Sequence, residues 1–169
     1  MTTASRGEVA IRTTDRSRHF TLGAGPGVVG RCRDLTRQAL QEWFGAPAVV
    51  GNVAVDDILL LVSEVVANAY EHGGAPYELR LDRAGRRLWV QVSDTSPVRP
   101  QPHGPHRASR TSGHGLYLLE RLSAGWGSVP RGRGKAVWFE VAVTDGSDPA
   151  VTDVSKAAVT DGAAPARPA

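Results

Sequence analysis

The sequence predicts an α+β fold, a two-layer α/β sandwich in which a mixed, mostly antiparallel sheet is covered by helices on one face. Three observations predict it: three segments with helical spacing of apolar residues, five short segments suited to strands, and the order β-α-α-β-β-α-β-β. The 169 residues are 41% hydrophobic, which is enough to bury one substantial core. We therefore expect a single domain.

The first strand is predicted near His19–Leu22, and a helix follows over Pro26–Phe44. Pro26 suits a first helical turn, and Gly45 ends the segment. One face of this helix is apolar, with Val28, Cys32, Leu35, Ala39 and Trp43. Cys32 is the only cysteine, so it cannot form an internal disulfide, and we interpret it as a buried, unreactive thiol.

A second helix is predicted over Val55–Glu71. It opens with Asp56 and Asp57, whose charges stabilise the positive end of a helix, and the glycines at 73–74 close it. Its apolar side chains cover almost the whole circumference, so we expect the helix to be almost fully buried.

Alternating residues predict strands around Tyr77–Leu81 and Leu88–Val92, joined in a hairpin by residues 84–86. The second of these strands ends at Asp94. A third helix is predicted over Gly113–Ser123, and strands over Trp126–Val129 and Lys135–Val143 complete the sheet.

Three segments lack any periodicity. Residues 1–15 are predicted to be a flexible arm and residues 144–169 a disordered tail, which leaves 16–143 as the folded domain. Residues 95–112 contain four prolines and are too long for a simple connector, so we expect a lid. No run of about 20 apolar residues spans a membrane, and the first residues do not resemble a signal peptide, so a cytoplasmic protein is expected.

The second helix carries a polar stripe formed by Asp57, Glu64, Asn68 and Glu71, with Glu64 and Asn68 one turn apart. The stripe either faces water at the edge of the sandwich or forms the wall of a pocket. In a pocket, the Asn68 carbonyl could hold Mg²⁺ and Glu64 could deprotonate an attacking hydroxyl.

Two further signals are ambiguous when each is taken alone. Asp94 is either a turn aspartate or an acceptor for a ligand amine. The segment 113–116, Gly-His-Gly-Leu, is either a hinge or a phosphate site at the positive end of a helix.

Together, and in this order, the three signals resemble the Bergerat-fold (GHKL) ATP-binding superfamily of gyrases, histidine kinases and anti-sigma-factor kinases. The resemblance runs from about Arg18 to Val143, and its most specific part is 61–73, Leu-Val-Ser-Glu-Val-Val-Ala-Asn-Ala-Tyr-Glu-His-Gly, which is similar to the N box. It implies ATP and Mg²⁺ as cofactors, with Glu64 as catalytic base and Asn68 as magnesium ligand. The other residues that it places at the nucleotide are His72, Asp94, Ser96, Gly113, His114, Gly115, Leu116 and Ala136.

Within this set, Asp94 matches the aspartate that binds the adenine amino group, and residues 113–116 match the second glycine box beneath the phosphates. Two positions depart from the family pattern. Ser96 stands where the family usually has glycine, and Ala136 stands where many members carry a threonine that supports the aspartate.

The short chain, the helix before the N box and the segment Lys135–Glu140 are most similar to the bacterial anti-sigma-factor serine kinases. This implies a serine/threonine-protein kinase that binds a sigma factor and phosphorylates a STAS-type anti-anti-sigma protein, and that can form a homodimer. Arg107 and Arg110 of the lid would steady the phosphates. The alternative is a non-catalytic module that binds a partner protein and has weak or lost nucleotide binding. Direct nucleic-acid binding is not expected, because the basic residues behind the net charge of +3 are scattered.

Overall fold

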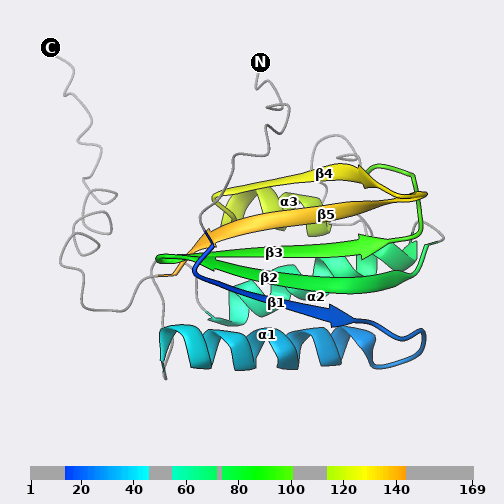
Figure 1. The fold of residues 1–169 in the computed structure, drawn as a ribbon. Helices are drawn as coiled ribbons and strands as arrows, with labels where there is room; N and C mark the ends of the chain where they lie inside the picture. Colours follow the sequence, from blue (N-terminus) through cyan, green and yellow to red (C-terminus); the bar gives the residue numbers. More distant parts are fainter. Residues whose placement is uncertain (1–13, 46–54, 72–73, 101–113, 144–169) are drawn as a thin grey trace, which may run out of the picture.

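The computed structural model describes residues 14–45, 55–71, 74–100 and 114–143, and all predicted helices and strands form within these ranges (Figure 1). Three predicted segments lie outside the described residues. They are the arm apart from residues 14 and 15, most of the lid, and the whole tail. The elements follow the predicted order: β1 (Arg16–Thr21), α1 (Val28–Phe44), α2 (Val55–Glu71), β2 (Pro76–Ala84), β3 (Arg87–Asp94), α3 (His114–Leu122), β4 (Gly125–Arg131) and β5 (Gly134–Ala142).

The five strands form one sheet in the order β1-β2-β3-β5-β4, and every described pairing is antiparallel. The prediction was a mixed, mostly antiparallel sheet, and the observed sheet differs in having no parallel pairing among the described strands. The three helices lie on the same side of this sheet, with α2 between α1 and α3 (Figure 1). The α+β two-layer sandwich is therefore confirmed.

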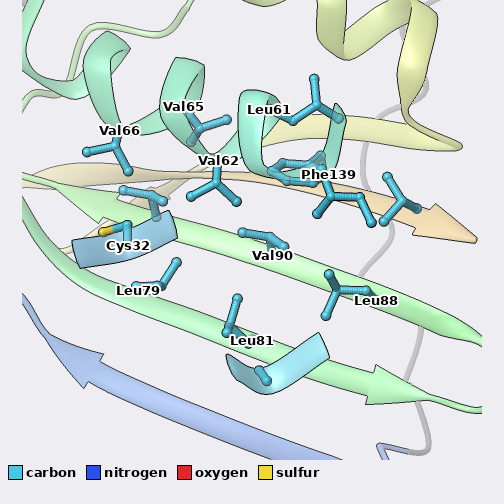
Figure 2. Packing of buried hydrophobic residues seen from close by; sticks show 14 of the residues in the cluster. Cys32, Leu61, Val62, Val65, Val66, Leu79, Leu81, Leu88, Val90 and Phe139 are labelled. Atoms are coloured by element: carbon cyan, nitrogen blue, oxygen red, sulfur yellow. The ribbon is translucent and has the colours of Figure 1, made fainter. Parts of the chain in front are cut away.

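The core lies between the sheet and the helices (Figure 2). Alternate residues of the strands point into it, as the period of two in a strand requires. Their partners on the helices are fully buried as well. Those labelled in the figure are Cys32 from α1; Leu61, Val62, Val65 and Val66 from α2; and Leu79, Leu81, Leu88, Val90 and Phe139 from the sheet.

The start of α1 differs from the prediction. Gly27 is the N-cap in a left-handed conformation with φ 93°, so the helix begins at Val28 and Pro26 lies before it. The buried face is also rotated, because Thr36 and Leu40 are buried whereas Leu35 is only half-buried. Thr36 can be buried because its hydroxyl donates a hydrogen bond to the Cys32 carbonyl at 2.8 Å.

Cys32 is completely buried, and this burial raises the pKa of its thiol from 9.0 to about 11. The unfolded chain loses the thiol proton first, so the folded protein holds more protons between about pH 9 and pH 11. We expect the free energy of unfolding to fall by about 2 to 3 kcal/mol across this window. Denaturant titrations at stepped pH check this; an equal decline in Cys32→Ala would contradict it.

The burial of α2 is less complete than predicted. Seven of its apolar side chains are buried, but Leu60 is 36% exposed and Tyr70 is 40% exposed. One side of α2 thus reaches the surface near the polar stripe. Neither α2 nor any other helix in the described parts of the chain has the length and apolar character needed to cross a bilayer.

Candidate functional site

Glu64 of α2 lies directly against the first turn of α3. A Cβ atom at Gly115 would be 2.8 Å from Oε2 of Glu64 and 3.2 Å from its Cβ, so Glu64 fills the space that a side chain at position 115 would need. The carboxylate therefore lies beside the N-terminal end of α3, where backbone N–H groups give a helix its positive end. The structure thus joins the polar stripe and the glycine segment, which are 51 positions apart in the sequence.

The other end of α2 meets the segment that follows β3. A Cβ atom at Gly74 would be 2.8 Å from Cβ of Ser96 and 3.1 Å from the Ala69 carbonyl oxygen. Thr95 and Ala75 are also joined, since the Ala75 N–H donates to the Thr95 hydroxyl at 3.0 Å. The residues just after α2, Gly74 and Ala75, therefore contact the segment that follows Asp94, while Glu64 within α2 contacts α3.

Asp94 is buried at the end of β3 and bonded on both of its carboxylate oxygens. The Ser96 N–H donates to Oδ1 at 2.8 Å, and Nζ of Lys135 lies 3.0 Å from Oδ1 and 3.0 Å from Oδ2. Lys135 also donates to the Ser96 carbonyl at 3.3 Å. The Asp94 and Lys135 side chains are only 2% and 1% exposed. Because an unpaired buried carboxylate is costly, Lys135 stabilises Asp94 in this position.

Ala136 lies on the other face of the sheet from Asp94, and the role at the nucleotide that the resemblance implies for it stays a prediction. In the β3–β5 pairing Asp94 is opposite Lys135, and Ala136 is opposite Ser93. Paired residues share a face of the sheet, so Ala136 and Ser93 lie on the face away from the helices. Both are completely buried there. A threonine hydroxyl at position 136 would thus point away from the Asp94 carboxylate.

Lys135 is the residue of this site that the sequence interpretation missed. Alternation within Lys135–Val143 contains the signal, because Val137, Phe139 and Val141 are core residues of β5 and Lys135 shares their parity. A buried position was not expected for Lys135, because lysine is rarely fully buried. Its burial becomes understandable only with the register that places Asp94 opposite.

The remaining predicted residues are placed as follows. Asn68 is half-buried on α2, one turn after Glu64, and Leu116 is half-buried on α3 and packs against the core. Ser96 is 4% exposed, and its hydroxyl accepts a hydrogen bond from the Val98 N–H at 3.3 Å. His114 is the first residue of α3. His72, Gly113, Arg107 and Arg110 lie outside the described residues.

Comparison with known families gives one match that covers most of the domain. A family model described as "Histidine kinase-like ATPase domain" matches residues 30–141, a range that contains α2, β3, α3 and nearly all of β5. The chain belongs to the histidine kinase-like ATPase family. The predicted resemblance to the Bergerat-fold superfamily is thereby confirmed, whereas the narrower anti-sigma-factor assignment stays a prediction.

Solved structures similar to this histidine kinase-like ATPase domain include histidine kinases. The catalytic domain of the histidine kinase ThkA is 14% identical, with a TM-score of 0.45, covering 76% of this chain and 96% of that one. The histidine kinase domain of a blue-light-activated histidine kinase from Erythrobacter litoralis is 25% identical, with a TM-score of 0.41, covering 72% of this chain and 66% of that one. Among curated proteins, no sequence match was found.

The two ends of the candidate site suit a nucleotide to different degrees. At the α3 end, the close approach at Gly115 leaves backbone rather than side chain next to Glu64, as a phosphate site at a helix N-terminus needs. Within the described ranges, no three His, Cys, Asp or Glu side chains gather to hold a metal. At the β3 end, Lys135 already bonds to the carboxylate that would receive the base.

Proposed function

We propose that this domain binds ATP with Mg²⁺ between α2, α3 and the end of β3. The observation that carries the proposal is the contact of Glu64 with Gly115, which joins the helix of the N box to the glycine-bearing start of α3. Membership of the histidine kinase-like ATPase family supports it. Asn68 would hold the metal ion, and the N-terminal end of α3 would hold the phosphates.

We further propose that the domain is an anti-sigma-factor-like serine-protein kinase. Bound ATP would supply the transferable γ-phosphate, and Glu64 would accept the proton of a serine hydroxyl on a STAS-type anti-anti-sigma protein. Glu64 is half-buried as a residue rather than fully enclosed, which is compatible with an approach of a hydroxyl from another protein. The similarity of the helix before the N box and of Lys135–Glu140 to anti-sigma-factor serine kinases supports the choice of substrate.

Replacing Asn68 by alanine tests nucleotide binding. We expect the variant to bind ATP in the presence of Mg²⁺ at least about tenfold more weakly, because a ligand to a charged group is lost. Calorimetric titration measures this directly. Gln38→Ala is a matched control, since it removes an amide from an exposed position on α1 and should leave the affinity unchanged. Equal affinity in Asn68→Ala would contradict the role of Asn68.

The Asp94–Lys135 ion pair favours a second candidate function, a partner-binding module with weak or lost nucleotide binding. An aspartate whose oxygens already accept bonds from Lys135 and the Ser96 N–H has less capacity for a ligand amine. If calorimetric titration of the wild-type protein shows no binding at millimolar ATP with Mg²⁺, the partner-binding function is supported and the kinase function is excluded.

A further inference from the structure

The ammonium of Lys135 lies against both oxygens of the Asp94 carboxylate, the group to which the proposed site assigns the amine of a purine. It contacts three oxygens, the two of Asp94 at 3.0 Å each and the Ser96 carbonyl at 3.3 Å. An ammonium has three hydrogens to donate, so these contacts use its full capacity. Both residues of the pair are buried, and Lys135 is among the largest fully buried side chains in the described part of the chain.

Enclosure of this kind blocks a ligand. The Asp94 side chain is 2% exposed, so its carboxylate is closed to a base in this structure, and Lys135 is one of the groups that cover it. The lysine also lies on the helix side of the sheet, since it is opposite Asp94 and in phase with the core residue Val137. It therefore occupies the layer between sheet and helices into which the proposed nucleotide site opens.

We propose that Lys135 fills the base subsite and sets both the affinity and the base specificity of this domain. The inference rests on the proposed nucleotide site. A base binds at Asp94 only after Lys135 moves out, so the apparent affinity of the wild-type protein is reduced by the fraction of molecules in which Lys135 has left. Lys135 is thus a specificity-determining residue that acts by competition for the Asp94 carboxylate.

The same geometry predicts which base gains when the lysine is removed. The 6-amino group of adenine is a donor, which an unoccupied Asp94 carboxylate can accept. In the same orientation, guanine would place its 6-oxo group at this point, an acceptor that Asp94 would repel but Lys135 could bond. A shorter neutral side chain at position 135 should therefore raise the affinity for ATP. The affinity for GTP should stay the same or fall.

Lys135→Thr tests this, because threonine suits a strand and its hydroxyl can still donate to the buried Asp94 carboxylate. We expect calorimetry with Mg²⁺ to give at least about tenfold tighter binding of ATP than in the wild-type protein, and no gain for GTP. The matched control is Arg87→Thr, which removes the same charge from a strand residue that pairs with Glu140 on the other face of the sheet. Its ATP affinity should equal that of the wild type.

Amine labelling of the wild-type protein tests the proposal without any substitution. The chain contains only two lysines, Lys135 and Lys156, so Lys156 serves as an internal reference. We expect an acylating reagent to modify Lys135 slowly without nucleotide and faster at saturating ATP, as read by mass spectrometry of peptides. This is the reverse of the protection that a ligand usually gives.

The outcomes separate this inference from the proposed function. If the wild-type protein binds ATP, but Lys135→Thr binds it no more tightly or Lys135 labelling does not rise, the inference fails and the nucleotide site stands. If only Lys135→Thr binds ATP, the inference is supported. If neither protein binds ATP at millimolar concentration, both proposals fail.

Discussion

Glu64→Gln should bind ATP as the wild-type protein does but transfer phosphate to a serine about a thousandfold more slowly. Removal of a general base typically costs between about a hundredfold and ten-thousandfold in rate. The amide has nearly the shape of the carboxylate, so its packing against Gly115 is preserved, but it cannot accept the proton of the attacking hydroxyl. Transfer of radioactive γ-phosphate from ATP to a STAS-type antagonist protein that the chain binds measures this effect.

The position of Glu64 explains why binding should survive. Its carboxylate touches the first turn of α3 at Gly115, whereas the groups proposed to hold the base and the metal are Asp94 and Asn68. A neutral side chain beside the start of α3 also repels a phosphate less than a carboxylate does. We therefore expect the dissociation constant for ATP to change by less than about threefold, which is under 1 kcal/mol.

A second acidic residue gives the control for Glu64. Glu120→Gln makes the same chemical change at an exposed position of α3 and should leave both transfer and binding unchanged. If Glu64→Gln transfers phosphate at the wild-type rate, Glu64 is not the base. If it loses ATP binding as well, the residue holds the site together and does not act only in the chemical step.

Most of the fold could be predicted because each helix and strand carries its own period. In α2 the apolar residues return at helical spacing and in β3 they alternate, and both segments end within one residue of their predicted limits. The N box could be found for the same reason, since Glu64 and Asn68 lie one turn apart on a single helix. Each of these signals is local, because it is contained within a single segment of the sequence.

The missing part of the site depends on contacts between distant segments. Lys135 becomes part of it only because Asp94, 41 positions away, is its partner across β3 and β5. The face on which Ala136 lies has the same origin, since a shift of one residue in register moves a side chain to the other face. Gly134 also lies directly against the Asp94 backbone of β3, and the Arg-Gly-Arg-Gly sequence of residues 131–134 does not show which of its two glycines makes such a contact.

Gly134→Ala should destabilise the domain by about 3 kcal/mol or more, because the new methyl group would overlap with backbone. A Cβ atom at this position would lie 1.9 Å from the Asp94 carbonyl oxygen and 2.9 Å from the carbonyl carbons of Asp94 and Thr95. Backbone atoms cannot rotate away as a side chain can. Relief requires β5 to separate from β3 where Asp94 pairs with Lys135.

The neighbouring glycine of the same turn separates this steric effect from a conformational one. Gly132 has φ 59° with no atom within 4 Å of a Cβ, so Gly132→Ala meets only the left-handed backbone cost of about 1 to 2 kcal/mol. Thermal unfolding followed by circular dichroism should show a melting temperature for Gly134→Ala that is lower than that of Gly132→Ala by roughly 5 °C or more. Equal melting temperatures would show that β3 and β5 do not approach as closely at Gly134. Because Lys135 is the next residue, the same displacement should also break its bond to Asp94.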